Sequence, residues 1–412
     1  MKKIYTGIEI GSYSIKILVS EYVSGKFHVL ASTNVRSKGI KNGLIVDTVE
    51  ASLSLKKAKQ NIEEMIGVEI NQAVVSVPSD GIKFDIVSGN ININKEEIID
   101  SKQITDVFSE AIIGKILDEH ELITILPISF QIDDGDAVKD PKGMMGEKLS
   151  VKAVITTIPK VFLNQTMTLF KECGIEVVDV GFSSLGDYYE VRNKEMDSEV
   201  IGIVNIGYDM TEVSIFNKGI MIKDEKIDAG SKLIDFDIAK KYELKKSVAR
   251  YLKENFAVSN TRYADVNDII EITNKSGDDI IINQLEISET VEARLVELLK
   301  LAKKQISILT NREISYIIIT GGISELAGFQ YVVENIFDRR ASTLNIGTMG
   351  VRSNVYSSVL GLIKYFHYKL ELRGNSYTMF NDKETENLIS TKKKDGNASN
   401  DNIISKVFSY FS

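Results

Sequence analysis

The chain has 412 residues, a net charge of −8 and a pI near 5.3, with 43% hydrophobic and 26% charged residues. These proportions are typical of a soluble globular protein large enough for two or more subdomains, and the acidic balance argues against broad nucleic-acid binding, which needs a basic face. One cysteine, Cys173, excludes an internal disulfide and favours a reducing cytosol. The N-terminus does not resemble a signal peptide, and no apolar run approaches the ~20 residues of a membrane-spanning helix.

The first 80 residues or so predict a strand, a turn, two further strands, a helix and a short buried strand. These are Ile4–Ser20 with a turn at Gly11-Ser12, Phe27–Thr33, Leu53–Ile66 and Ala73–Pro78. A similar order begins again near residue 200. Its segments are Gly202–Ile206, Thr211–Phe216, Ile220–Ile227, Ser288–Leu309 and Ile317–Thr320.

The two halves can be laid over each other. "GIEIGSYSIKILVS" and "GIVNIGYDMTEVSIF" share a strand, an Ile-Gly turn and a return strand, with Glu9 opposite Asn205 and Gly11 opposite Gly207. Two unrelated hairpins would also contain turn glycines, but the matching order of the following elements favours duplication. An internal repeat of this size predicts two similar lobes that face each other across a cleft.

Two regions depart from this repeat. Between Phe84 and Pro159, acidic-polar helix candidates (Lys95–Asp118) alternate with strands at Glu121–Ile132 and Lys148–Ile158, which predicts a small inserted subdomain. After Leu370 the chain loses periodicity and becomes rich in Asn, Lys, Asp, Ser and Gly, a composition typical of a flexible linker.

Three glycine-containing turns are candidate phosphate-binding elements. They are Gly11-Ser12-Tyr13-Ser14 with Lys16 nearby, Gly207-Tyr208-Asp209-Met210-Thr211, and the Gly321-Gly322 pair in "IIITGGISELAGF". Glycine lets a backbone approach a ligand closely, and tight turns point N–H groups toward phosphate oxygens. After the third turn we expect a helix to begin near Ser324, and a helix N-terminus favours negative charge. None of the turns fits the Walker or Rossmann patterns.

In this order, the turns resemble the actin/Hsp70/sugar-kinase ATP-binding superfamily, and within it the FtsA family of bacterial cell-division proteins. The resemblance runs from about Tyr5 to Leu370, and its most similar segments are "GIEIGSYSIK", "KGIKNGLIVD", "DPKGMMGEKL" and "TGGISELAGF". It implies an α/β, two-lobed actin-like fold with duplicated sheet-and-helix subdomains and an FtsA-type inserted subdomain. It also implies a disordered C-terminal linker that ends in an amphipathic helix.

The resemblance implies the following division of the chain. Lobe 1 comprises residues 1–83, 160–199 and 346–371 and is interrupted by the inserted subdomain, 84–159. Lobe 2 comprises 200–345 and includes a subdomain at about 235–305. The linker is 372–401 and the membrane-targeting helix 402–412.

The resemblance also implies that ATP and Mg²⁺ bind between the lobes. The implied nucleotide-binding residues are Gly11, Ser12, Tyr13, Lys16, Gly207, Tyr208, Asp209, Met210, Thr211, Gly230, Gly321, Gly322 and Ile323, and the implied metal ligands are Glu9, Asn205 and Asp209. No catalytic residue is assigned.

The second phosphate turn departs from the family pattern. FtsA proteins usually read D-I-G-G-G-T there, whereas this chain has Asn205 in place of the acid and Tyr208 and Asp209 in place of two glycines. The change at 205 removes a charge that would help hold a metal ion, although Asp209 could partly restore it. We therefore expect ATP binding with, at most, slow hydrolysis.

The last eleven residues, "NIISKVFSYFS", are strongly apolar. On a helix, one face would carry Ile403, Ile404, Val407, Phe408 and Phe411. A helix that docks on its own protein would show the same pattern, but the preceding linker and the resemblance favour an interfacial membrane anchor. A single anchor of this kind binds marginally and becomes firm when a polymer presents many copies.

The implied function is that of a polymerising adaptor that tethers FtsZ filaments to the cytoplasmic face of the membrane at the division site. Its partners would be the C-terminal peptide of FtsZ, other copies of itself, the membrane through its C-terminal helix and other division proteins, with no nucleic acid. The resemblance places Arg294 at the FtsZ-peptide site, although a solvated Glu–Arg pair would use the same residue types.

Two alternative functions belong to the same fold. A pilus- or competence-assembly ATPase of the FtsA superfamily would share the insertion, but a long amphipathic tail would be unusual there. A small-molecule kinase would need a catalytic Asp near the cleft and no such tail, so Asn205 and the C-terminal segment both favour the adaptor.

Overall fold

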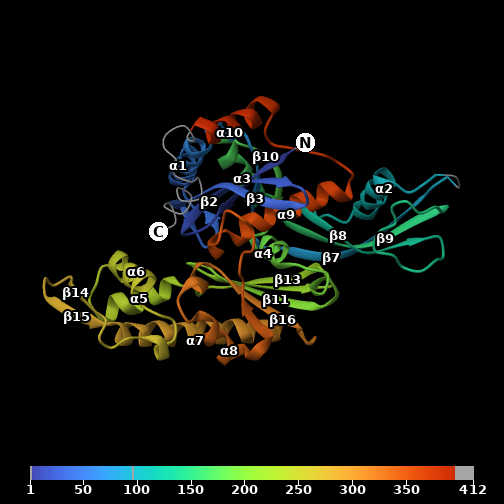
Figure 1. Ribbon diagram of the computed structural model, residues 1–412. Helices are drawn as coiled ribbons and strands as arrows, with labels where there is room; N and C mark the ends of the chain where they lie inside the picture. Colours follow the sequence, from blue (N-terminus) through green and yellow to red (C-terminus); the bar gives the residue numbers. More distant parts are fainter. Residues whose placement is uncertain (1, 95–96, 395–412) are drawn as a thin grey trace.

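The computed structural model describes residues 2–94 and 97–394. Figure 1 shows two lobes, one above the other in this view, and a smaller sheet-and-helix unit that projects to one side of the upper lobe. The upper lobe, lobe 1, combines the N-terminal strands with the last helices of the described chain. The lower lobe, lobe 2, is built from the middle of the chain.

Lobe 1 is built on a five-stranded sheet in the order β10-β6-β1-β2-β3. The central strand, β1, is buried along nearly its whole length, as expected for a strand covered on both faces. Helix α1 begins after Asp47, whose side chain accepts a hydrogen bond from the N–H of Glu50, and ends at Gly67 in the left-handed conformation. The elements of this lobe are β1 (Lys3–Ile10), β2 (Ser14–Val23), β3 (Lys26–Arg36), β4 (Ile40–Lys41), β5 (Leu44–Ile45), α1 (Thr48–Ile66), β6 (Gln72–Ser76), α3 (Lys160–Glu172), β10 (Glu176–Gly181), α4 (Ser183–Val191) and α9 (Ser357–Leu372).

Lobe 2 has a second five-stranded sheet in the order β13-β12-β11-β16-β17. The long helix α7 packs on this sheet and on α5, and a two-stranded sheet, β14-β15, extends from it. The elements are β11 (Val200–Ile206), β12 (Thr211–Asn217), β13 (Ile220–Ile227), α5 (Lys232–Lys241), α6 (Lys246–Asn255), β14 (Ile269–Thr273), β15 (Asp279–Asn283), α7 (Gln284–Leu309), β16 (Tyr316–Thr320), α8 (Phe329–Phe337) and β17 (Ala341–Thr343).

The two sheets repeat each other strand for strand, which confirms the duplication expected from the sequence. In each, a three-stranded antiparallel meander is followed by two parallel strands. The first turns also close alike: the N–H of Gly11 donates to the carbonyl of Ser14 at 3.0 Å, and that of Gly207 donates to the carbonyl of Met210 at 2.9 Å. Glu9 and Asn205 therefore occupy equivalent positions near the ends of β1 and β11.

The projecting unit is a three-stranded antiparallel sheet in the order β7-β9-β8, with one helix packed on β7 and β9. The helix is shorter than the candidate segment at 95–118, and it begins with a capping box between Asp100 and Gln103. The elements are β7 (Lys83–Asn92), α2 (Ser101–Ile112), β8 (His120–Ile132) and β9 (Lys148–Pro159).

Helices α4 and α9 cross near the centre of the molecule, where the two lobes meet. Their contact is made by Gly186 and Gly361, and a Cβ on Gly361 would overlap the carbonyl of Gly186. Small residues at this crossing let the two backbones approach closely. The crossing places Asp187, the residue after Gly186, against the first turn of α9 and next to the end of β11.

The prediction that residues 372–401 form a flexible linker is wrong over residues 373–394. The N–H of Met379 donates to the carbonyl of Ile4 at 2.9 Å, the side chain of Phe380 is buried in the core of lobe 1, and helix α10 (Asp382–Lys394) follows. Four clustered residues, "YTMF" at 377–380, supply this contact within a stretch that is polar on average. Residues 395–401 and the predicted anchor 402–412 lie outside the described residues. No helix that the structure describes is long and apolar enough to cross a membrane.

Candidate functional site

A cavity of about 440 Å³ lies between the lobes, and all three predicted phosphate turns reach it. The residues predicted for nucleotide or metal that line it are Glu9, Gly11, Ser12, Tyr13, Lys16, Asn205, Gly207, Tyr208, Asp209, Met210, Gly321, Gly322 and Ile323. The fold thus gathers segments more than 300 residues apart into one cleft.

Two predicted residues, Thr211 and Gly230, support the second turn from behind instead of lining the cavity. The Thr211 hydroxyl is buried and donates to the carbonyl of Ala229 at 2.7 Å. At Gly230, a Cβ would come within 2.7 Å of the backbone of Asp209 and Met210, so only glycine lets the following segment pack against this turn.

The tip of the lobe 1 hairpin carries two peptide N–H groups above an ion pair between Lys16 and Glu9. Within the described chain, no hydrogen bond engages the peptide N–H groups of Ser12 and Tyr13. Beneath them, Lys16 donates to Glu9 at 3.0 Å. The N–H of Ile10 donates to the hydroxyl of Ser76 at 3.1 Å, which ties the hairpin to β6.

In the lobe 2 hairpin, both oxygens of Asp209 are engaged. One accepts from the N–H of Asn42 at 3.1 Å, across the cleft, and the other pairs with Lys232 at 3.0 Å. Burial acts to raise the pKa of Asp209, but these hydrogen bonds outweigh it and lower the pKa. These contacts favour a role for Asp209 in joining the lobes over the predicted role as a metal ligand.

Tyr13 and Tyr208, one from each phosphate hairpin, touch across the cleft with ring centroids 5.0 Å apart. The guanidinium of Arg36 lies 4.0 Å from the centre of the Tyr13 ring, and that of Arg250 lies 4.5 Å from both rings. Arg250 also donates to the Tyr208 hydroxyl and is held by Asp235. We call Tyr13, Tyr208, Arg36 and Arg250 the tyrosine clasp. The sequence departure at 208 therefore creates a bridge between the lobes.

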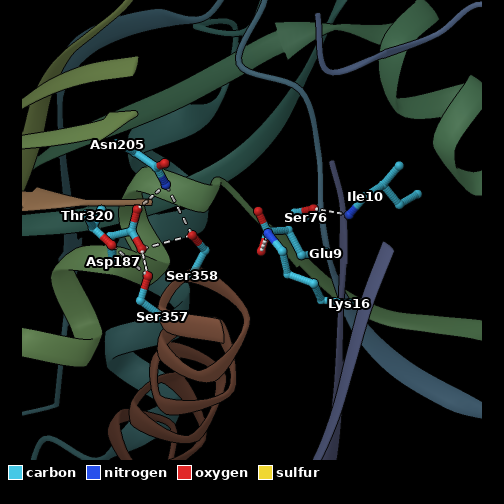
Figure 2. Close-up of polar contacts among 9 residues, drawn as sticks. All are labelled: Glu9, Ile10, Lys16, Ser76, Asp187, Asn205, Thr320, Ser357 and Ser358. Atoms are coloured by element: carbon cyan, nitrogen blue, oxygen red, sulfur yellow. Dashed lines mark hydrogen bonds and ion pairs between the residues drawn. The ribbon is translucent and has the colours of Figure 1, made fainter. Parts of the chain in front are cut away.

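Behind Asn205 lies a carboxylate that the sequence did not indicate. Asp187, on α4, is fully buried and accepts hydrogen bonds from Asn205 at 2.7 Å, Ser357 at 2.6 Å and Ser358 at 2.8 Å (Figure 2). Burial raises its pKa to about 7, the charge of Glu9 adds to the rise, and the three hydrogen bonds oppose it. Nothing in the local sequence distinguishes Asp187 from an ordinary helix residue, because its partners come from two other elements.

A second unpredicted polar group lies beside the cavity. The Ser79 hydroxyl donates to Glu212 at 2.6 Å, and Lys226 pairs with Asp80. Burial raises the pKa of Glu212, and the charge of Asp224 adds to the rise. Ser79 and Asp80 follow a predicted buried strand directly, a position that could have indicated them. Within the described chain, no cluster of three or more His, Cys, Asp or Glu side chains is arranged to hold a metal ion.

At the third turn, Gly321 adopts a φ of +100°, and a Cβ there would overlap the carbonyl of Ile206. Gly322 is more open, since its Cβ would meet only Val355, at 3.3 Å. A short 3₁₀ helix (Gly322–Glu325) follows, so the helix predicted to begin near Ser324 is a single 3₁₀ turn there, and the α-helix begins only at Phe329. The left-handed backbone of Gly328, at the N-cap of α8, separates the two helices.

Arg294 lies on α7, outside the cavity lining. It donates to both oxygens of Asp237, at 2.6 and 3.0 Å, and to Glu297 at 2.6 Å. The side chain remains about a quarter exposed, at 26%.

Comparison with known proteins identifies two FtsA segments in the chain. Residues 80–157 match the SHS2 domain inserted in FtsA, and residues 202–361 match the cell division protein FtsA. The chain belongs to the FtsA family. Similar proteins include the cell division protein FtsA of Enterococcus faecalis, 24% identical over 88% of this chain and 83% of the relative. That of Bacillus subtilis is 23% identical over 90% of this chain and 85% of the relative. The FtsA-type role in cell division follows.

Solved structures show the same actin-like fold. The PilM–PilN type IV pilus biogenesis complex matches with a TM-score of 0.59 and 13% identity over 87% of this chain and 97% of that one. MreB5 of Spiroplasma citri bound to ADP matches with a TM-score of 0.53 and 13% identity over 90% of this chain and 97% of that one. The two-lobed fold and the resemblance to FtsA inferred from the sequence are therefore confirmed.

Proposed function

We propose that this FtsA-family protein is a nucleotide-dependent scaffold that tethers FtsZ filaments to the cytoplasmic membrane at the division site. ATP would lie in the cavity between the lobes, with its phosphates between the two hairpins. The observation that carries the proposal is the convergence of three glycine turns, from both lobes, on one cavity in a chain of this family. MreB5, which shares the fold, was solved with ADP.

The residues present fit a nucleotide with a divalent cation. Peptide N–H groups at the tips of both hairpins, at Ser12, Tyr13, Tyr208 and Asp209, make no hydrogen bond to another described residue and could donate to phosphate oxygens. Glu9 and Asn205 each carry a side-chain oxygen at the cavity, and oxygen ligands suit Mg²⁺. Bound Mg²⁺ would neutralise phosphate charge. Asp187, one layer behind, would hold Asn205 in place.

The FtsZ peptide would bind the subdomain at about 235–305, which contains α5, α6, the β14-β15 hairpin and most of α7. Its exposed apolar side chains include Phe236 and Ile281, which are 41% and 62% exposed. Arg294, on α7, would pair with an acidic group of the peptide in exchange for one of its present partners, Asp237 or Glu297. Self-association would present many copies of this site along a filament.

The membrane contact would be made by residues 402–412 at the end of the chain. Because α10 packs on lobe 1 through Leu388 and continues to Lys394, residues 395–401 join this helix to the segment. The average span of a flexible chain of seven residues would be roughly 15 Å. The anchor would therefore keep lobe 1 close to the bilayer, whereas the predicted 30-residue linker would permit a greater distance.

The test is co-sedimentation of FtsZ with liposomes that contain anionic lipid. We expect the full chain to bring FtsZ to the liposomes with ATP present, and a chain ending at Lys394 to leave FtsZ in solution. Replacing Phe408 and Phe411 with Ser is the matched control, because it removes apolar area and keeps the length. If the chain ending at Lys394 recruits FtsZ as well as the full chain does, the proposed anchor is wrong.

A further inference from the structure

The carboxylate of Asp187 joins three elements at the floor of the cleft. It lies on α4 and accepts from Asn205 at the end of β11 and from Ser357 and Ser358 in the first turn of α9. Ser357 in turn contacts the hydroxyl of Thr320, the last residue of β16, at 3.0 Å. Figure 2 shows these side chains gathered on one side of the cleft, with Glu9 and Lys16 opposite.

The chemistry of this contact determines which way the Asn205 side chain faces. Both oxygens of Asp187 accept hydrogen bonds, one from the NH₂ group of Asn205 and the other from Ser357 and Ser358, so the Asn205 amide turns its NH₂ group toward Asp187. Its oxygen then lies on the other side, where it comes within 3.0 Å of the position that a Cβ on Gly321 would occupy. Both Asn205 and Gly321 line the cavity, so a carboxamide oxygen is presented to a ligand.

The same contact explains why position 205 is neutral in this chain. An aspartate at 205 would place a second carboxylate 2.7 Å from that of Asp187, and Glu9 faces the same group across the cleft. Two carboxylates at this distance cannot both ionise without a large cost. With one acid and one amide, the pair at 187 and 205 keeps its hydrogen bond and carries at most a single negative charge.

We propose that Asp187 is a positioning residue of the nucleotide site: it aims the Asn205 oxygen at the cavity and, when ionised, supplies from behind the negative charge that position 205 lacks. This inference rests on the proposed nucleotide function. It predicts that the acid and the amide can be exchanged between positions 187 and 205, because the pair needs one of each.

The experiment compares four chains: the wild type, Asp187→Asn, Asn205→Asp and the double exchange. ATP affinity is measured by calorimetry with Mg²⁺ and again with excess EDTA. We expect Asp187→Asn to lose about tenfold in affinity with Mg²⁺, as is usual when a supporting partner of a metal ligand is removed. In EDTA, the ATP affinity of Asp187→Asn should stay close to that of the wild type. With Mg²⁺, the double exchange should recover most of the affinity that Asp187→Asn loses. Ser357→Ala is the control, since it removes one donor to Asp187 and leaves the contacts of the Asn205 amide with Asp187 and Ser358 in place.

A second measurement does not depend on nucleotide. The side-chain NH₂ signals of Asn205, assigned by NMR in the nucleotide-free protein, should show a strong hydrogen bond in the wild type and lose it in Asp187→Asn. The thermal midpoint of Asn205→Asp should fall, and the double exchange should restore it.

The outcomes separate the two proposals. If the wild type binds no ATP in either buffer, the proposed nucleotide site is wrong and this inference falls with it. If the wild type binds ATP and Asp187→Asn binds it equally well with Mg²⁺, only the inference is overturned. A double exchange that remains as impaired as Asn205→Asp would also overturn it, even if Asp187→Asn merely destabilised the fold.

Discussion

Single residues at the two hairpin tips form side-chain contacts between the lobes across the cleft. Where the family pattern has glycine at the second turn, Tyr208 and Asp209 here reach across to lobe 1. Glycine at these two positions has no side chain to reach lobe 1, so the contact between the hairpin tips would be left to the nucleotide. The clasp adds direct contacts of its own, through an aromatic pair worth roughly 0.5–1.5 kcal/mol and cation–π contacts of similar size.

Removing one ring of the clasp should speed nucleotide release. In Tyr208→Ala the ring pair and the contacts with Arg36 and Arg250 are lost, so the closed cleft is less favoured and a fluorescent ATP analogue should dissociate about tenfold faster. Stopped-flow displacement measures this rate. Tyr263→Ala is the matched control, because the Tyr263–Tyr331 pair has the same 5.0 Å spacing within lobe 2. Equal rates in the two variants would contradict a clasp.

A charged side chain at Gly322 should abolish ATP binding. A small side chain would fit there, since its Cβ meets only Val355, but the carboxylate of Gly322→Glu would extend into the cavity. Calorimetry should show at least a hundredfold loss of affinity, about 2.7 kcal/mol or more. Gly347→Glu is the control, because that position is exposed and open. Unchanged affinity in Gly322→Glu would remove this turn from the site.

At the scale of elements, helix α7 carries the predicted partner contact. Arg294→Glu would exchange the ion pairs with Asp237 and Glu297 for repulsion, yet these groups are partly exposed, so the stability cost should stay near ~1 kcal/mol or below. Binding of an FtsZ C-terminal peptide, measured by fluorescence anisotropy, should weaken while ATP affinity is kept. Arg340→Glu, at a surface pair with Glu313, is the control. Peptide affinity equal to that of the wild type would exclude Arg294 from the site.

The docked C-terminal segment is the other element with a measurable role. A chain that ends at Leu372 would lose Tyr377, Met379 and Phe380 from their contacts with lobe 1. Because the removal of a large buried side chain typically costs ~2–5 kcal/mol, its thermal midpoint should fall by several degrees. A chain that ends at Lys394 should melt like the full chain. If both truncations melt alike, the segment contributes nothing to the fold.

At the scale of the whole molecule, we propose that the cleft holds nucleotide for longer than a kinase would. The lobes are joined by the clasp, by the Asn42–Asp209 contact and by the hydrogen bond between Asn205 and Asp187 beneath them. The acid nearest to position 205 is buried one layer behind the cavity wall. A scaffold of this kind gains from a ligand that stays bound.

ATP turnover should therefore be slow. We expect a rate well below the ~1–100 per second of kinases, measured by phosphate release at saturating ATP. The Gly322→Glu variant gives the background, since activity that survives in it belongs to another protein. Turnover within the kinase range would contradict a scaffold in which nucleotide serves mainly to hold the lobes.

The sequence by itself determined the duplicated hairpins, the inserted subdomain and the three glycine turns. These depend on local patterns: alternating burial along strands, helical spacing and the backbone freedom of glycine. For the same reason, nearly all of the residues predicted from the turns line the cavity. The sequence also indicated that Asn205 and Tyr208 depart from the expected phosphate-turn pattern, but it did not indicate which residues they contact.

Only the tertiary structure decided what those departures do. Asp187 meets Asn205 because α4 and α9 cross at two glycines, and Tyr208 meets Tyr13 because the lobes close on each other. The segment at 377–380 is ordered because lobe 1 provides a surface for it, although its average composition predicts a linker. A pattern within one segment indicates which of its residues are buried. Their partners come from distant parts of the chain through packing, and the free energy of each contact depends on both partners.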